Sequence, residues 1–248
     1  MLDKIEKDQG QDAAPEDRAG NLSNAKELNV ALSSLAVAAA VAFSFGGTRF
    51  HVLAATVLAL LPVVLIYFVH RGPSLYAIFK PRRDPRTDLG IAFMVCGLGL
   101  ILGNTDMHFV ETPTLLVYAA LVGLMCCVAL FSPTSQNPQL FRTMIGLLLC
   151  AGAFGWGLAA TADTLPDNSA PANYMTTVQG KHAAHGRSTT YYLDLAPWGP
   201  IQQLNTVSVP HRMYDGANFG DPVCFELRPG ALHVQWYQVV ACAERSGR

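Results

Sequence analysis

Few residues of this chain have types and spacing that could support chemistry, and two histidines come first. His182 and His185 lie three positions apart, which on a helix would place both on one face and suit a zinc ion. Gly180 and Gly186 flank them between two predicted strands, and no cysteine or carboxylate is close in sequence. We therefore interpret this segment as a solvated hairpin tip and predict no metal site.

A second group of polar side chains lies around the connections between apolar runs. Asp106, His108 and Glu111 follow the third run, and His51 begins the second. Together they could form a cation or proton site, or serve an enzyme acting at the outer membrane face. All four lie at run ends or in loops, where water reaches them, so chance placement is the better interpretation.

Other catalytic patterns are missing from the sequence. It contains no H-E-x-x-H motif and no Gly-rich phosphate loop. Cys126 and Cys127 are adjacent inside an apolar run, whereas a redox enzyme needs a C-x-x-C pair near an interface, where thiolate forms. We therefore expect no catalytic residue and no cofactor. The net charge of −1 gives no reason to expect nucleic acid as a partner.

The composition indicates which elements must position any site. The chain is 51% hydrophobic and 14% charged, against roughly 25% charged for an average soluble domain. Long uncharged runs alternate with short polar loops, which is typical of a polytopic membrane protein. After a disordered tail over residues 1–28, we predict an α-helical bundle over 29–161. Its five spans cover residues 29–45, 51–69, 89–103, 113–131 and 140–161.

Two of these spans have features that bear on packing. The first, 29–45, is near the lower length limit for crossing a membrane. The third contains Gly99 and Gly103, a small-xxx-small pair that lets helix backbones approach closely.

The loop from His70 to Asp88 sets the predicted orientation. Short basic loops stay on the cytoplasmic side, because moving Lys or Arg across the bilayer is costly. Its apolar middle, Leu75 to Phe79, is too short to span, and we interpret it as a turn in the headgroup layer, with a plain connector as the alternative. We expect the basic side chains to face anionic membrane lipid. They are Arg71, Lys80, Arg82, Arg83 and Arg86.

Five spans put the two termini on opposite sides of the membrane. With the basic loop inside, the N-terminal tail is cytoplasmic and the loop around residues 104–112 is outside. The C-terminal part is then also outside, which in bacteria means the periplasm. We thus expect a multi-pass protein of the cell inner membrane.

After a linker over residues 162–171, the period of the sequence changes from helical to two. Short stretches rich in β-branched and aromatic residues predict five strands within 172–243, at 174–178, 188–195, 205–209, 222–227 and 232–240. This suggests a small antiparallel β domain, barrel-like and of the size of an OB- or SH3-like module.

Cys224 and Cys242 could form a disulfide that stabilises so small a domain. If the preceding turn centres on Pro229 and Gly230, however, Cys224 faces about Gln235, and Cys242 lies seven residues further along. The last strand would then have to bend back for the two sulfurs to meet.

The same region carries a resemblance. The segments Gly220-Asp221-x-Val223-Cys224, Pro229-Gly230-Ala231-Leu232, Trp236-Tyr237 and Cys242, with Tyr191-Tyr192-Leu193 before them, resemble the C-terminal module of uncharacterised bacterial multi-span membrane proteins. The resemblance covers about the last third of the chain. It implies an inner-membrane protein whose paired cysteines belong to the module, and it implies no activity.

These observations favour a non-enzymatic function. We predict that the β domain binds a periplasmic or membrane protein, or another envelope component, through exposed aromatic anchors. The predicted anchors are Tyr191, Tyr192, Trp198 and Tyr214. For each of them packing in the core is the other possibility, and one of Tyr191 and Tyr192 must point inward on a strand. The alternative is a small-solute transporter or channel, with the glycine-rich third and fifth spans lining its path. An enzyme at the outer face is the third hypothesis.

Overall fold

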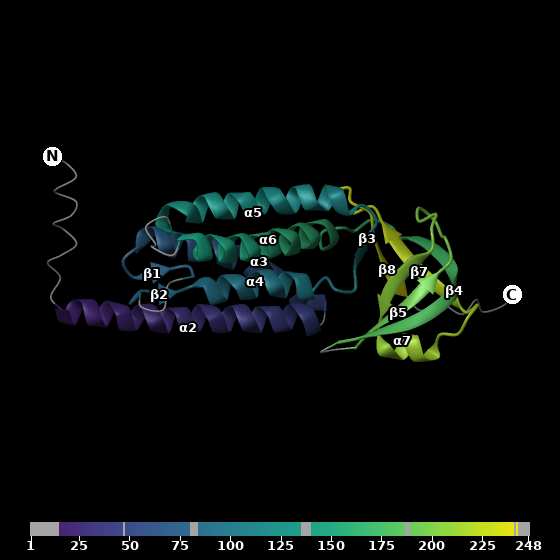
Figure 1. The fold of residues 1–248 in the computed structure, drawn as a ribbon, viewed down its shortest axis with the longest axis horizontal. Helices are drawn as coiled ribbons and strands as arrows, with labels where there is room; N and C mark the ends of the chain where they lie inside the picture. The colour runs from purple at the N-terminus through teal and green to yellow at the C-terminus, as the bar shows by residue number, and fades with distance from the viewer. Residues whose placement is uncertain are drawn as a thin grey trace. The chain divides into compact units, whose positions relative to one another are not determined.

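The computed structural model describes residues 15–46, 48–79, 84–134, 140–186, 189–240 and 242 (Figure 1). The chain divides into two compact units. The first is Met1–Gly103 with Tyr118–Ala159, and the second is Asn104–Val117 with Ala160–Arg248. The first unit is helical, and the second contains the β domain.

Long apolar helices make up the first unit. The described helices of this part of the chain are α2 (Pro15–Phe45), α3 (Thr48–Arg71), α4 (Gly90–Leu102), α5 (Thr112–Thr134) and α6 (Leu140–Thr164). Four stretches are long and apolar enough to cross a membrane, namely Gly20–Phe45, Phe50–Arg71, Thr112–Phe131 and Thr143–Thr164. They indicate a multi-pass membrane protein.

The prediction of five spans is not confirmed, because the third run forms a short helix. α4 has 13 residues, which give about 20 Å of helix against a hydrocarbon thickness of about 30 Å. The first run is longer than expected. α2 begins at Pro15, so residues 15–28, predicted as part of a disordered tail, are helical. Residues 1–14 lie outside the described residues.

Glycines allow α4 to pack closely against its neighbours. A Cβ at Gly99 would lie 2.7 Å from the Cβ of Ala40, and one at Gly103 would overlap the ring of Phe43, so both predicted small residues face α2. Gly97 on α4 packs in the same way against the backbone of Phe154 on α6. The predicted close approach of helix backbones is therefore confirmed at Gly99, where a Cβ would lie 3.2 Å from the Cα of Ala40, whereas Gly103 makes room for the ring of Phe43.

The loop before α4 is ordered by one carboxylate. Two short strands, β1 (Tyr76–Ala77) and β2 (Thr87–Asp88), pair in parallel. The amides of Phe79 and Gly90 both donate to Oδ1 of Asp88 at 2.9 Å. Thr143 of α6 donates to the carbonyl oxygen of Phe79 at 3.4 Å. The loop thus contacts the helices of its own unit and is more than a plain connector.

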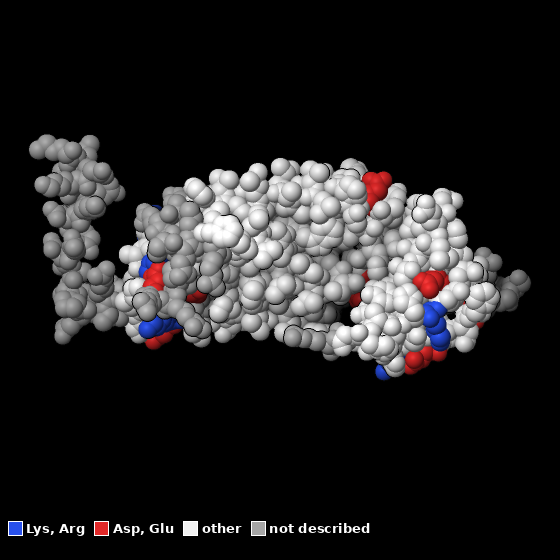
Figure 2. Space-filling view, in the orientation of Figure 1, with Lys and Arg blue, Asp and Glu red and all other residues white. Residues whose placement is uncertain are grey.

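The basic residues of this loop have different surroundings. Arg86 binds Asp84, with Nη2 2.6 Å from Oδ2, and also donates to the carbonyl oxygen of Pro73. Arg71 is exposed and its guanidinium lies 5.7 Å from the ring centroid of Tyr67. Lys80, Arg82 and Arg83 lie outside the described residues, and contact of these side chains with lipid stays a prediction. In Figure 2 the coloured atoms of this unit gather near β1 and β2, and the helix sides are white.

The second unit contains an antiparallel half-barrel with the strand order β3-β8-β7-β4-β5-β6. Its strands are β3 (His108–Phe109), β4 (Ala172–His185), β5 (Thr189–Leu195), β6 (Asn205–Val209), β7 (Pro222–Arg228) and β8 (Trp236–Val240). The helix α7 (His211–Gly216) follows β6. The predicted antiparallel β domain is therefore confirmed, with β3 added from the loop between α4 and α5.

The register of the last hairpin differs from the prediction. Arg228 pairs with Trp236, so residues 229–235 form a long connection where a tight turn was expected. Residues 232–235, predicted to begin the last strand, belong to this connection. Cys224 consequently pairs with Val240, and Cys242 is only two residues further along the chain.

The core of the half-barrel is aromatic. Trp198 and Phe225 stack with ring centroids 4.2 Å apart, and Tyr237 meets both rings edge-on. Asn205 of β6 donates from Nδ2 to the hydroxyl of Tyr237 at 2.9 Å. This bond links β6 to β8, which lie apart in the strand order.

Candidate functional site around α7

One of the four predicted anchors is in the core. Trp198 is only 4% exposed, because its backbone pairs with Ile201 and its indole stacks on Phe225. The prediction that Trp198 is an exposed anchor is therefore wrong. Its large apolar ring stabilises the half-barrel instead.

Two of the other anchors meet beside α7. The rings of Tyr191 and Tyr214 lie 4.9 Å apart, and His211 packs 4.5 Å from Tyr191. Lys181 donates from Nζ to the carbonyl oxygens of Tyr214 and Ala217, at 3.1 and 2.8 Å. A lysine at these carbonyls satisfies the C-terminal end of a short helix and fixes α7 on the sheet.

The fourth anchor, Tyr192, points to the other face of β5. Its ring stacks on His182 at 5.1 Å. Asp194 lies on the same face, with Oδ2 3.4 Å from Nδ1 of His182, and Thr206 donates to its Oδ1 at 2.6 Å. The predicted anchors therefore do not form one surface, because neighbouring residues of a strand face opposite ways.

The histidines first considered as metal ligands lie within β4. His182 and His185 are three residues apart on a strand, so their side chains leave from opposite faces. In the part of the chain that the structure describes, no three His, Cys, Asp or Glu side chains come together to hold a metal ion.

His108 packs against the half-barrel and does not form a site with Asp106, Glu111 and His51. The imidazole of His108 stacks on Tyr237 at 5.2 Å. Burial lowers the pKa of His108, with Asp106 and the Ser208 backbone partly opposing this effect. His108 is therefore neutral near pH 7 and contributes to the edge of the half-barrel. Asp106 and Glu111 are exposed, and His51 packs against Phe43 in the first unit.

An apolar groove lies on the other side of α7. Its volume is about 170 Å³, and α7, the turn after it, β7 and the end of β8 contribute its walls. The lining residues are Met213, Gly216, Ala217, Asp221, Pro222, Val223, Val240 and Cys242. We call this groove, with α7 and the turn 217–221, the α7 surface.

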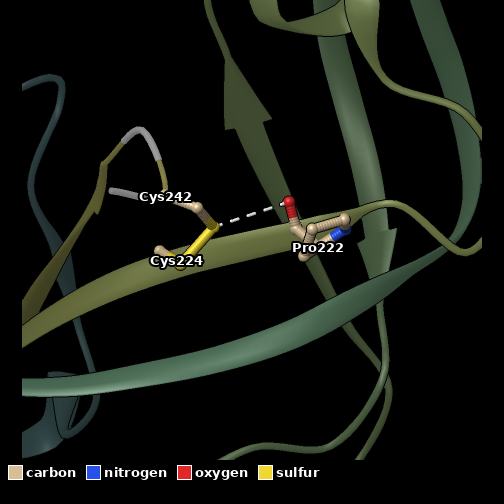
Figure 3. Close-up of a disulfide and its surroundings, with 3 residues drawn as sticks. All are labelled: Pro222, Cys224 and Cys242. Carbon is tan, nitrogen blue, oxygen red and sulfur yellow. Dashed lines mark hydrogen bonds between the residues drawn. A yellow bond between two sulfur atoms is a disulfide. The ribbon is translucent and has the colours of Figure 1, made fainter. Parts of the chain in front are cut away.

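The predicted disulfide fixes one rim of the groove. Cys224 and Cys242 are bonded, with their Cα atoms 5.0 Å apart (Figure 3). The Cys242 sulfur lies 3.7 Å from the carbonyl oxygen of Pro222, a contact and not a true hydrogen bond, since a disulfide sulfur carries no hydrogen. The bond holds Cys242, which follows β8, against β7.

An exposed phenylalanine stands beside the groove. Phe219 is 77% exposed, although residues on both sides of it line the groove. Its turn is held firmly, because the amide of Asn218 donates to Oδ2 of Asp221 at 2.8 Å and that of Gly220 to the carbonyl oxygen of Val178 at 2.8 Å. Sequence reasoning missed Phe219, and its only signal was one aromatic residue within a polar turn.

The predicted linker 162–171, whose first residues belong to the end of α6, is firmly bonded to the loop 229–235. Asp163 is fully buried, and its Oδ1 accepts from the amide of Leu232 at 2.8 Å. Asp167 accepts from the amide of Gly230 and from Nε1 of Trp236, at 3.0 and 3.1 Å.

The charge of Asp167 is stabilised by these bonds. Burial alone would raise the pKa of Asp167, but the hydrogen bonds from Ser169, Gly230 and Trp236 outweigh it and hold the pKa below its usual value. The end of α6 and the base of the half-barrel thus form one hydrogen-bonded structure.

Comparison with models of known protein families, with curated proteins and with solved structures finds no match for this chain. The class of protein is therefore defined by its own features: apolar helices that indicate a multi-pass membrane protein, and a disulfide-bonded antiparallel half-barrel.

Proposed function

We propose that this chain is an inner-membrane protein whose periplasmic β domain binds a protein partner through the α7 surface, without catalysis. The observation that carries this proposal is the apolar groove next to Phe219. Exposed aromatic side chains beside a preformed pocket are typical of the centres of protein interfaces.

Three observations support the proposed orientation. β3 pairs with β8, so the loop between α4 and α5 and the β domain lie on the same side of the membrane. The basic loop 70–88 is at the other end of α4, and basic loops remain cytoplasmic. The disulfide favours an oxidising compartment for the β domain, which in bacteria is the periplasm.

This orientation requires α4 to complete a crossing despite its length. We propose that the ordered loop before it, held by Asp88 and in contact with Thr143 of α6, makes up the missing distance. A loop at membrane depth is tolerated where protein surrounds it, and Ala77 and Ile78 are buried.

The packing of Gly155 and Gly157, two glycines of the fifth predicted span, does not favour the transporter hypothesis. A Cβ at Gly155 would overlap the carbonyl oxygen of Ala119, and one at Gly157 would lie 2.6 Å from the Cβ of Leu100. These glycines lie at contacts between helices, so they are not available to line a path.

In vivo photocrosslinking of the full chain tests the proposed function. A benzophenone amino acid replaces Met213 or Phe219, and adducts are sized after irradiation of intact cells. Leu204, which is 63% exposed, is the matched control, since β6 separates it from α7 by about 20 Å of strand. We expect protein adducts at positions 213 and 219 and none at 204. Absence of protein adducts at both test positions would refute the proposal.

The orientation is tested separately with a reporter fused after Arg248. We expect a periplasm-active reporter to function there and a cytoplasm-active one to fail. The opposite result would overturn the proposed topology.

A further inference from the structure

The α7 surface contains both a projecting side chain and a cavity suited to it. Phe219 is 77% exposed and so leaves its own groove unfilled. The groove measures about 170 Å³, and an apolar protein cavity of about 150 Å³ holds a benzene ring. Its volume therefore fits one phenyl side chain, whereas pockets for drug-sized ligands start at about 300 Å³.

We propose that the partner of the α7 surface is a second copy of this chain, with Phe219 of each copy inserted into the groove of the other. This inference rests on the proposed function and names its partner. A projection and a cavity side by side on one patch make that patch self-complementary, so a two-fold axis satisfies both at once.

The charges of α7 fit the same arrangement. Arg212 and Asp215 are both exposed on this six-residue helix, where Oδ2 of Asp215 also lies 3.3 Å from Nε2 of His211. Their opposite signs allow Arg212 of one copy to face Asp215 of the other when two α7 helices lie antiparallel across a two-fold axis. Such complementarity fixes the register of the two copies more than it adds affinity.

The size of the contact sets its strength. Each phenylalanine buries about 150–250 Å², so two rings with the groove surfaces they cover remove roughly 600–1,000 Å² in all. A stable interface buries about 1,200–2,000 Å². The contact is therefore weak between free domains and depends on the membrane helices, which confine both copies and raise their effective concentration.

The groove can be closed without disturbing the fold. A Cβ at Gly216, which lines the groove, meets nothing within 4 Å, and its backbone does not have a positive φ. Gly216→Phe fills the cavity with the chain's own side chain, and Phe219→Ala removes the projection. Each variant alone abolishes both contacts of a symmetric pair.

The experiment uses full-length chains carrying two different epitope tags, co-expressed in membranes. The benzophenone probe replaces Asn218, which is exposed in the turn 217–221 but does not line the groove. We expect an adduct that carries both tags. Phe219→Ala and Gly216→Phe, each present in both copies, should reduce that adduct about tenfold, whereas Leu204→Ala should leave it unchanged.

Mixing the two variants gives the decisive result. A Gly216→Phe chain retains its projection and a Phe219→Ala chain retains its groove, so the mixed pair regains one of two contacts. Recovery of about half the adduct supports the inference and shows that both variants are folded. Failure of the mixture to recover, or an adduct that persists in each variant, overturns it.

The same probe separates this inference from the proposed function. Adducts at position 218 that contain only other proteins overturn the second copy as partner and leave a protein-binding role intact. If no protein adduct forms at positions 213, 218 or 219, both proposals fail.

Discussion

Replacing Gly230 with alanine tests how the base of the half-barrel is held together. Gly230 has a φ of +74°, and a Cβ there would overlap both carboxylate oxygens of Asp163 and the carbonyl oxygen of Val234. Two other glycines of the domain provide matched controls. Gly220 has a φ of +86° with open space around it, and Gly216 has open space and no positive φ.

The three substitutions should change the free energy of unfolding by different amounts, each for its own reason. At Gly220 the only cost is that alanine must adopt a left-handed backbone conformation, which destabilises the fold by about 1–2 kcal/mol. Alanine at Gly216 should be neutral or stabilising by up to about 1 kcal/mol. At Gly230 the backbone cost is joined by displacement of the buried Asp163 carboxylate from the Leu232 amide, a charged hydrogen bond of about 1.5–3 kcal/mol. The total is about 3–5 kcal/mol.

Amide hydrogen exchange of the full chain in detergent, read on peptides from β7 and β8, measures these costs for the second unit alone. Since about 1.4 kcal/mol corresponds to a factor of ten, Gly230→Ala should accelerate exchange by roughly 10²–10⁴. Gly220→Ala should accelerate it about tenfold. Equal effects of Gly230→Ala and Gly220→Ala would show that Asp163 does not brace the loop 229–235.

Three further predictions concern the same unit. Replacing Cys224 and Cys242, which are 18 residues apart, with serine should destabilise it by about 3 kcal/mol; an unchanged exchange rate would contradict this. Trp198→Ala should cost about 3–5 kcal/mol because its indole is buried, and a cost typical of surface sites would argue that Trp198 is exposed. The pKa of Asp167 is lowered by hydrogen bonds, so its stabilising effect is complete above about pH 4 and is lost as the pH falls through the folded-state pKa. Asp167→Asn should therefore flatten the acid limb of stability against pH, and an unaltered limb would exclude this role.

The number of helices could be read from apolar runs, but their lengths could not. The run 89–103 has the composition of a span, yet α4 has only 13 residues. Composition does not distinguish a side chain facing lipid from one packed in protein, and Phe93 and Leu100 are fully buried in the bundle. α2 shows the opposite error, a helix longer than predicted. Residues 15–28 are polar and still helical, because α2 continues beyond its apolar part.

The strands were predicted from their β-branched and aromatic residues, and the bounds at 188–195, 205–209 and 222–227 were right to within a residue. β4 instead continues to His185, through the segment interpreted as a hairpin tip. The register of the last hairpin was wrong for a long-range reason. Pro229 and Gly230 predict a tight turn, but Asp163 and Asp167 bind the amides of the loop from more than 60 positions away. A local sequence signal cannot contain such contacts, and the same error in register implied that the last strand must bend back before Cys224 and Cys242 could meet.

The candidate site was the least predictable feature. Prediction from residue type alone selected Trp198 as an exposed anchor, although its indole is part of the core. It missed Phe219, which is exposed because of the turn that holds it. The groove is lined by α7, β7 and the residue after β8. These segments are not adjacent in the sequence, so no local pattern could indicate the groove. Only the disulfide between Cys224 and Cys242 gave an advance sign that these segments meet.

The shortness of α4 also has a consequence for how the protein is made. A helix of 13 residues is shorter than the roughly 20 residues that a helix needs to cross the membrane by itself. Gly97 and Leu100 of α4 pack against Phe154 and Gly157 of α6, which are synthesised later. We therefore expect α4 to settle only after α6 has emerged from the ribosome, so that biogenesis of the bundle ends with its central helix and not with its last one.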